Sequence, residues 1–386
     1  MNILLINYEY PPIGAGAANA TWHIAREMVA LGHHAVVLTS SYKRQHGRTI
    51  EDGVVVYRVP TIRKARDHSN SVEMSAFILS ASLSITAVGR REAINGCVAF
   101  FSIPGGPVAL LAHLLHGIPY VVSLRGGDVP GNEPRLAAVH RLLTPLRRGV
   151  LGHATAIVAN SQGLKTTSEK ADPFPVTVIP NGVDTDFFRP RRPETAVRRE
   201  GPFRFLFVGR FQPQKNLFHL LEQMALLAKT TTTPFELHLV GDGPERKHLL
   251  EFARSGSIND IIKWHDWCSK EQIRQHYWDA NCFVNPSVYE GMPNTVLEAM
   301  ACGLPTIVSA IGGNNELTVH GETGWCVSLG GSTGLPQAAL TYLNDPSMAL
   351  RHGAAGRVRV EGFGAWSVVS SRYVALIGDR GELQSR

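Results

Sequence analysis

The stretch Asn285-Pro-Ser-Val-Tyr-Glu-Gly-Met-Pro-Asn-Thr-Val-Leu-Glu-Ala-Met-Ala-Cys-Gly-Leu-Pro305 has the residue order of a loop followed by a helix. The apolar run 282–284 directly before it is typical of a buried strand, and residues 295–302 are typical of a helix ended by the following glycine and proline. Strand, loop and helix in this order often carry a ligand in α/β folds. The stretch therefore predicts an α/β fold with a binding site on this loop.

Two carboxylates, Glu290 and Glu298, flank the turn in this loop. A helix that starts near Asn294 directs its first N–H groups and its positive dipole end toward the loop, which favours an anion such as a diphosphate. Because helical side chains lean toward the N-terminus, Glu298 can reach the same ligand and accept hydrogen bonds from hydroxyl groups. Two simpler interpretations stay open: Thr295 to Glu298 fits a capping box, and Glu290 fits a solvated loop acid.

The N-terminal part of the chain shows the same alternation. An apolar strand at 3–8, a loop with Gly14 and Gly16, a helix at 17–31 and a strand at 36–38 predict a βαβ unit. The two glycines are not a complete dinucleotide fingerprint and can simply permit a tight turn. Their loop nevertheless follows the carboxyl end of a strand, where open α/β sheets bind ligands. Further strands are expected at 54–59, 98–102, 119–124, 154–160 and 176–180.

The alternation starts again after a segment rich in charge and proline at 189–202, which predicts a domain boundary. We expect a first domain over residues 1–185 and a second over 186–364. The pattern predicts an α/β protein of two doubly wound parallel-sheet, Rossmann-like domains that face a cleft. Strands of the second domain are expected at 203–208, 235–240, 261–264, 282–284, 306–309 and 325–327.

Composition limits the class of protein. The chain of 386 residues is 44% hydrophobic, which is ample for full-sized cores. Its five cysteines are widely spaced without a C-x-x-C pair, which favours a reducing compartment and argues against a zinc site. The first residues lack the features of a signal peptide, so we expect a cytoplasmic protein. No His, Cys, Asp or Glu cluster has metal spacing, so we expect no metal or other cofactor.

The net charge of +6 is unevenly distributed, because residues 1–190 hold 18 Lys and Arg against 13 Asp and Glu. A basic first half favours an anionic partner, such as a phosphorylated or lipid-linked substrate or a membrane surface. We expect no nucleic-acid partner, since no nucleic-acid motif accompanies these residues. The basic segment 62–68 precedes the apolar stretch 74–88, for which a buried helix is favoured. The basic segment and the apolar stretch together can also rest on an anionic membrane.

Two further loops carry candidate binding residues. Arg125-Gly-Gly-Asp128 follows the strand at 119–124, and Arg125 can hold an anion there, although a surface loop with an internal Arg–Asp pair is the alternative. Arg210 and Lys215 follow the strand at 203–208 and suit a diphosphate, although both can be ordinary surface cations. The segments 241–243 and 265–267 are expected along the same sheet edge.

Together these motifs resemble those of family 4 glycosyltransferases, which are retaining enzymes of the GT-B fold that use nucleotide sugars. The pair Glu290 and Glu298, with seven residues between them, fits the family's E-x7-E pattern. The other matches extend over nearly the whole chain in the family's order. They are Gly14/Gly16, Pro180-Asn-Gly-Val-Asp184, Val208-Gly-Arg-Phe-Gln-Pro-Gln-Lys-Asn216, Leu239-Val-Gly-Asp-Gly-Pro244, Pro286-Ser-x-x-Glu-Gly291, Leu297-Glu-Ala-Met-Ala-x-Gly303, Gly312-Gly313 with Glu316, and Gly321-x-Thr-Gly324.

The resemblance implies a role for each matching position. Glu290 and Arg125 are expected near the transferred hexose as catalytic residues, while Glu298 binds the nucleotide ribose. The nucleotide is also expected to lie near Gly241, His265, Asp266 and Trp267, and the acceptor near Gly14 and Asp128. The residues expected to contact the donor diphosphate are Arg210, Lys215, Gly16, Gly291, Met292, Pro293 and Asn294.

One departure affects the first domain. Many relatives have a histidine where this chain has Arg125, and a guanidinium does not titrate near neutral pH, so Arg125 is a poor general base. It can bind a phosphate or the acceptor instead.

The resemblance implies transfer from a UDP- or GDP-sugar to a glycan, lipid-linked or polysaccharide-precursor acceptor in cell-envelope or exopolysaccharide synthesis. An epimerase or a non-catalytic binding homologue stays as the alternative. The resemblance also implies that a final helix over about 365–386 packs on the first domain.

Overall fold

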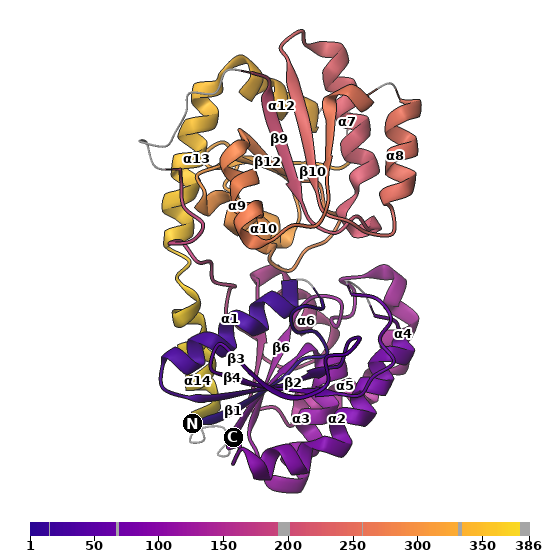
Figure 1. Ribbon diagram of the computed structural model, residues 1–386, viewed down its shortest axis with the longest axis vertical. Coiled ribbons are helices and arrows are strands. Elements are labelled where there is room, and N and C mark those ends of the chain that lie inside the picture. Colours follow the sequence, from indigo (N-terminus) through magenta and orange to yellow (C-terminus); the bar gives the residue numbers. More distant parts are fainter. Residues whose placement is uncertain (15, 67–68, 192–200, 257, 331–333, 379–386) are drawn as a thin grey trace. The chain divides into compact units, whose positions relative to one another are not determined.

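The computed structural model describes residues 1–14, 16–66, 69–191, 201–256, 258–330 and 334–378, which form two compact α/β units (Figure 1). The first unit contains Met1–Gly182 together with the chain from Trp366, and the second contains Val183–Ala365. Three parts of the expectations above fall outside the described residues: 67–68 of the basic segment, 192–200 of the boundary segment, and 379–386 at the end of the last helix. The predicted class, two doubly wound sheets with helices, is confirmed.

The first unit is built on an eight-stranded sheet of order β3-β4-β2-β1-β5-β6-β7-β8. All neighbours are parallel except β3 and β4, which form an antiparallel hairpin. Its strands are β1 (Asn2–Ile6), β2 (His34–Ser40), β3 (Gly47–Glu51), β4 (Val54–Val59), β5 (Gly96–Phe100), β6 (Tyr120–Leu124), β7 (Ala156–Ala159) and β8 (Thr177–Val178). Its α-helices are α1 (Gly16–Ala30), α2 (Ser71–Arg91), α3 (Gly106–His116), α4 (Ala137–Leu142), α5 (Thr144–Gly152), α6 (Gln162–Ala171) and α14 (Trp366–Gly378).

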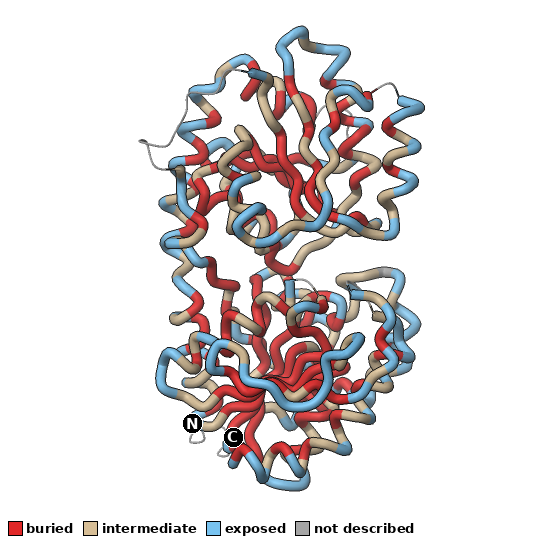
Figure 2. Tube along the Cα trace, viewed as in Figure 1, coloured by how far each residue is buried: buried red, intermediate tan, exposed pale blue. Residues whose placement is uncertain are grey.

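The apolar residues of β1 pack on both faces of this sheet, because successive strand side chains point to opposite sides. Leu4 lies in one core cluster with side chains of α2, α3 and α5, whereas Leu5 lies in another with side chains of α1 and α14. Figure 2 shows the central strands buried and the helices exposed on their outer sides. A strand buried on both faces needs a continuous apolar run, and residues 3–6 supply one.

The helix α14 belongs to the first unit although it comes last in the chain. The Tyr373 hydroxyl lies 2.7 Å from the Ser123 hydroxyl at β6, and the Ser370 hydroxyl donates to the carbonyl of Ile24 in α1. At Gly182 a Cβ atom would lie 2.8 Å from the backbone N of Trp366, so this junction requires glycine. These contacts place Tyr373 beside the loop that follows β6.

The second unit has six parallel strands in the order β11-β10-β9-β12-β13-β14. The chain order reverses between β9 and β12, so the loops after these two neighbouring strands leave the same edge at the topological switch point, where such sheets bind ligands. Its strands are β9 (Phe203–Val208), β10 (Phe235–Val240), β11 (Ile262–His265), β12 (Cys282–Asn285), β13 (Thr306–Ser309) and β14 (Gly324–Val327). Its α-helices are α7 (Leu217–Thr230), α8 (Arg246–Ser255), α9 (Lys270–Asp279), α10 (Asn294–Ala301), α11 (Gly312–Leu317), α12 (Gly334–Asn344) and α13 (Pro346–Glu361).

Candidate functional site

The loops after β9 and β12 meet through an ion pair between Lys215 Nζ and Glu290 Oε1. The two side chains are only 15% and 10% exposed, so neither is an ordinary surface charge. Gln214 reinforces the junction, because its Nε2 donates to the carbonyl of Tyr289 at 2.8 Å and lies 3.5 Å from Glu290 Oε2. The sequence predicted both charged residues at this edge but not their pairing.

A buried polar network holds the Glu290 loop from behind. The Ser287 hydroxyl lies 2.8 Å from Glu290 Oε1 and 2.6 Å from Asn285 Oδ1 at the end of β12. Asn314 Nδ2 donates to the carbonyl of Ser309, 3.0 Å away, and the Ser309 hydroxyl donates to the carbonyl of Ser287. Sequence analysis missed this network, although buried Asn and Ser residues beside glycine turns are typical of a fixed loop. The network fixes where the Glu290 carboxylate lies.

Glycines let the loops of this edge approach each other at backbone distance. A Cβ atom at Gly313 would lie 1.9 Å from the carbonyl oxygen of Gly291, and one at Gly241 would lie 2.0 Å from that of Gly209. Gly241 also has φ +140°, a conformation that other residues rarely adopt. The motif glycines therefore bring the loop after β9 against that after β10, and the loop after β12 against that after β13. The pair of Lys215 and Glu290 joins these two sets into one surface. Arg210 follows Gly209 directly and is half-buried on this surface.

The helix α10 begins at Asn294, with Pro293 as its N-cap and no capping side chain. The capping-box interpretation of Thr295 and Glu298 is therefore wrong, since Thr295 lies inside the helix. Glu298 instead accepts a hydrogen bond from the Tyr277 hydroxyl at 3.0 Å. Burial raises the pKa of Glu298 to about 7, while Lys270 and the Tyr277 hydroxyl oppose this shift. A half-buried carboxylate of this kind can accept hydrogen bonds from ligand hydroxyls.

The segments 241–243 and 265–267 lie side by side as expected from the sheet order. The amide of Gly241 donates to the carbonyl of His265 at 3.1 Å. Arg246 joins the two loops, because it donates to the carbonyl of Gly241 at 2.9 Å and pairs with Asp266 at 2.8 Å. Trp267 is 48% exposed and offers an aromatic surface beside this junction.

In the first unit, Arg125 is held in place by neutral partners. Its guanidinium donates to Asn181 Oδ1 at 2.8 Å and to the Tyr373 hydroxyl at 3.4 Å, and it lies 4.8 Å from the ring centre of Phe100. Burial lowers the pKa of the guanidinium. Its buried Nε–H group has no hydrogen-bond partner among the described residues. Buried polar groups are normally hydrogen-bonded, so this N–H is an exception among the described side chains.

Asp128 organises the Arg125 loop through backbone bonds. Its carboxylate accepts hydrogen bonds from the amides of Arg125, Gly126 and Ser102 at 2.9, 3.1 and 2.6 Å. Burial raises the pKa of Asp128, and these three hydrogen bonds oppose the shift. The internal Arg–Asp pair considered from the sequence involves only the backbone of Arg125. The role of Asp128 toward an acceptor stays a prediction.

The loop after β1 encloses Gly14, whose amide donates to the carbonyl of Arg66 at 2.8 Å, and Gly16 is the first residue of α1. Arg63 is buried against this loop, where it pairs with Glu9 at 3.5 Å and donates to the carbonyl of Tyr8. The expectation that Arg63 contributes to a membrane-facing basic segment is therefore wrong. A buried guanidinium requires paired acceptors, and this loop provides them.

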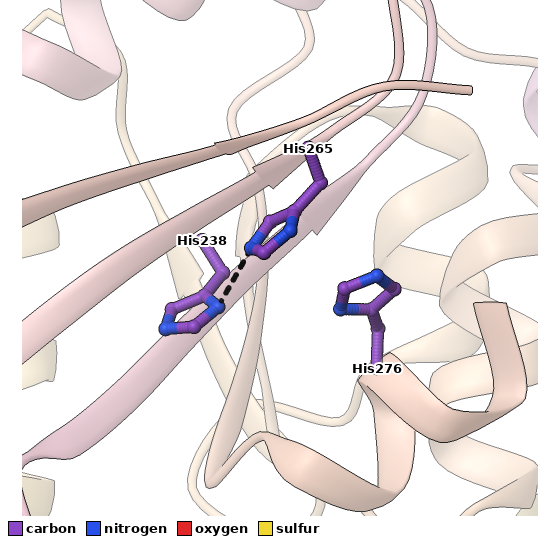
Figure 3. A group of neighbouring side chains, drawn as sticks. All are labelled: His238, His265 and His276. Carbon is purple, nitrogen blue, oxygen red and sulfur yellow. Dashed lines mark hydrogen bonds between the residues drawn. The ribbon is translucent and has the colours of Figure 1, made fainter. Parts of the chain in front are cut away.

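The sequence also missed a group of three histidines in the second unit. His238, His265 and His276 are widely separated in the sequence, without metal-site spacing, yet each offers one nitrogen within 4.8 Å of the others (Figure 3). No sequence pattern predicted this group, and the expectation that the protein needs no metal stays a prediction.

Comparisons with known proteins match both units. Residues 15–182 match the family model described as Glycosyl transferase 4-like domain, and residues 189–359 match Glycosyl transferases group 1. Glycogen synthase of Mycobacterium tuberculosis is 26% identical to this chain, and the alignment covers 100% of this chain and 96% of that protein. Two solved structures share the fold. Sucrose-phosphate synthase of Thermosynechococcus elongatus has a TM-score of 0.83 at 20% identity, covering 97% and 98% of the two chains. Anabaena HepE in complex with UDP-glucose has a TM-score of 0.75 at 16% identity, covering 98% and 99%.

Proposed function

Because the chain belongs to the glycosyltransferases of the GT-B fold and the family 4 type, we propose that it moves a hexose from a nucleoside diphosphate sugar to a hydroxyl group of a carbohydrate acceptor, with retention at the anomeric carbon. The observation that carries this proposal is the set of charges at the switch point of the second sheet. Arg210, Lys215 and Glu290 follow β9 and β12, and Glu298 lies one turn into α10 at the same edge.

The donor diphosphate fits the two cations of the loop after β9. Lys215 pairs with Glu290, and a diphosphate would give it a second anionic partner. Arg210 adds a planar donor suited to phosphate oxygens. The nucleotide ribose is then placed at Glu298, and the base near 265–267. The proposed donor is a UDP-sugar, a choice supported by the UDP-glucose complex of HepE, with a GDP-sugar as the alternative.

Transfer breaks the bond between the anomeric carbon and a diphosphate oxygen, and it forms a bond from that carbon to the acceptor oxygen. The diphosphate takes the bonding electrons, and Arg210 and Lys215 stabilise the added charge. The acceptor hydroxyl must lose its proton, which a diphosphate oxygen can receive. Glu290 stabilises the positive charge that develops on the sugar. Since the two cations neutralise the leaving group, we propose that transfer requires no metal ion.

For the first unit we propose contact with the acceptor and the reacting sugar. Arg125 supports this role, because it follows β6 at the carboxyl edge of the first sheet, where open α/β sheets bind ligands, and Asn181 holds its cation in place. The loop around Gly14 is proposed as a second acceptor contact. The acceptor class is a glycan, lipid-linked or polysaccharide precursor of the cell envelope or exopolysaccharide. The excess of positive charge in residues 1–190 supports an anionic or lipid-linked acceptor of this kind.

We also propose that the first unit rests on an anionic membrane at the cytoplasmic face. Val72, Leu79 and Leu83 form one exposed stripe along α2 and are 66%, 65% and 78% exposed. By length and composition alone α2 could cross a bilayer, but Phe77 and Ile85 on its other side pack in the core of the unit. A helix that packs on a sheet with one face and exposes apolar residues on the other can lie parallel to a membrane surface, with the exposed apolar residues in contact with lipid.

Arginines on other helices of the first unit support an anionic surface. Residues 134–149 contain four arginines and no acidic residue, and three of these arginines, Arg135, Arg141 and Arg148, are exposed. They belong to the region of α4 and α5, and α5 packs with α2 and α3 in one core cluster on the same face of the sheet (Figure 1). Each basic residue near an anionic membrane contributes roughly 1 kcal/mol of attraction.

A panel of UDP- and GDP-sugars, with and without acceptor extracts, tests the proposed reaction. Release of the nucleoside diphosphate that depends on acceptor is the expected result. Conversion of the donor sugar without acceptor would indicate an epimerase instead. Donor binding without release or conversion in any mixture would indicate a non-catalytic binding protein.

A further inference from the structure

Three imidazoles from separate elements of the second unit converge in one place. Figure 3 shows His238 on β10, His265 at the end of β11 and His276 on α9 with their rings directed toward one another. The strand register explains the first two. His265 is opposite Val240, so it lies diagonally from His238 on the same face of the sheet. The helix α9 covers this face, since Tyr277 packs with Val240 in the same core cluster.

The geometry approaches that of a metal site. His238 Nδ1 lies 3.1 Å from His265 Nε2, and the third nitrogen lies within 4.8 Å of both. Two imidazole nitrogens on one tetrahedral Zn²⁺ are about 3.3 Å apart, given Zn–N bonds of about 2.0 Å. A rotation of the His276 ring is therefore the main adjustment that a bound ion requires.

A carboxylate behind the cluster fixes the orientation of one ring. Glu236 Oε2 lies 2.9 Å from His238 Nε2, so the carboxylate accepts a hydrogen bond from the Nε2–H group, and the Nδ1 lone pair is directed toward the cluster. Metal-bound histidines almost always donate their other N–H to such a group. Arg204 and Lys263, at 3.4 and 4.0 Å, hold the Glu236 carboxylate in turn.

A metal binds an imidazole nitrogen through its free lone pair, so the neutral ring is the ligand form. Among the side chains that the structure describes, His276 contacts the His265 ring but forms no hydrogen bond, so its ring nitrogens lack an internal partner.

We propose that His238, His265 and His276 bind one divalent transition-metal ion of the Zn²⁺ class, with the fourth position open to water. Three imidazole nitrogens favour Zn²⁺, Co²⁺ or Ni²⁺ over Mg²⁺ or Ca²⁺, which prefer oxygen ligands. The ion would join α9 to β10 and β11. One of its ligands, His265, also begins the segment 265–267 that is proposed to border the nucleotide base.

One consequence of this site rests on the proposed function. Tyr277 follows His276 in α9, and its hydroxyl donates to Glu298, the proposed ribose ligand. An ion that fixes α9 therefore also fixes the hydrogen-bond partner of Glu298. Metal binding is measured without any sugar donor. A failure of the proposed function would therefore not contradict the metal site, and an absence of metal binding would not contradict the proposed function.

The test uses the full chain without a purification tag, stripped with EDTA and titrated with ZnCl₂ in a calorimeter. We expect one Zn²⁺ per chain, with binding weakened at least about 100-fold in His276→Ala and about 10-fold in Glu236→Gln. His248→Ala is the matched control, because His248 is exposed on α8, and it should bind as the unmodified chain does. Zn²⁺ binding that is unchanged in His276→Ala, or lost equally in His248→Ala, would overturn the proposal.

A second measurement needs no variant and covers the case in which His276→Ala does not fold. Titration of the stripped chain with CoCl₂ should give the visible absorption of a tetrahedral Co²⁺ bound by nitrogen. A cobalt–thiolate charge-transfer band would instead assign the ion to the free cysteines, and the absence of any visible band would exclude a tetrahedral site. Either of the last two results would contradict the three-histidine site.

Discussion

At the scale of single residues, the pairing of Lys215 with Glu290 changes how the site is understood. From the sequence these residues had separate roles, one on the diphosphate and one beside the sugar. In the structure the two charges form an ion pair, and Ser287 and Gln214 hold the carboxylate. A charge that is already paired and oriented needs little rearrangement when a ligand arrives, which is the condition for electrostatic stabilisation of a transition state.

Replacing Glu290 by Ala should abolish most of the sugar transfer. We expect a fall in kcat of at least about 100-fold, because the developing positive charge loses its nearest carboxylate, while UDP affinity stays within a few-fold. Steady-state rates and UDP calorimetry measure the two effects. Glu322→Ala, at an exposed position of the same unit, is the control and should change neither. Near-normal turnover in Glu290→Ala would remove its catalytic role.

Glu298 makes stability depend on pH in a defined direction. Its pKa is about 7 in the folded chain and 4.5 as the reference value, so between these pH values the folded state binds more protons than the unfolded state. The contribution of Glu298 to the free energy of unfolding therefore falls as pH rises from 4.5 to 7. Glu298→Gln lacks this loss. The difference in free energy of unfolding between the variant and the unmodified chain should therefore shift in favour of the variant by about 1–3 kcal/mol from pH 4.5 to pH 8.

Urea unfolding of Glu298→Gln and of the unmodified chain at both pH values measures this difference. The exposed variant Glu322→Gln should show no comparable change. An equal effect of pH on the two chains would mean that Glu298 is not a carboxylate with a raised pKa.

At the scale of elements, the strands were the most predictable feature and the helices that cover them the least. The apolar runs at 3–6 and 205–208 are continuous because parallel strands are buried on both faces. By contrast, the segment that forms α9 carries many polar residues, and neighbouring elements decide its structure. The hairpin strand β3 was also missed, since Gly47–Glu51 is largely exposed and lacks an apolar pattern.

The exposed stripe of α2 leads to a prediction about membrane binding. The double variant Leu79→Gln/Leu83→Gln should reduce binding to vesicles of anionic phospholipid by about 10-fold, because two buried leucine contacts with the lipid are lost. Co-flotation with vesicles measures this change. Leu350→Gln is the control, because Leu350 is 75% exposed on α13 in the second unit. Equal flotation of all three chains, or no flotation of the unmodified chain, would contradict the proposed membrane contact.

At the scale of the whole molecule, the sequence predicted the order of the parts but not the partnerships between distant residues. The ordered motifs predicted two Rossmann-like sheets, and Gly209, Gly241 and Gly313 mark where loops pack at backbone distance. Three contacts join residues of separate elements. They are the hydrogen bond between Tyr277 and Glu298, the one between Arg125 and Asn181, and the group of three histidines. Such contacts depend on register and packing, for which a single sequence carries no local signal.

The central claim is that the switch point of the second sheet binds the donor diphosphate. Calorimetric titration of the chain with UDP and GDP tests it most directly, with Arg210→Met as the variant and Arg254→Met, at an exposed position of α8, as the control. We predict that one nucleoside diphosphate binds per chain, that Arg210→Met weakens this binding at least about 10-fold, and that Arg254→Met leaves it unchanged. Absence of binding by both nucleotides, or equal affinity in Arg210→Met and the unmodified chain, would contradict the claim.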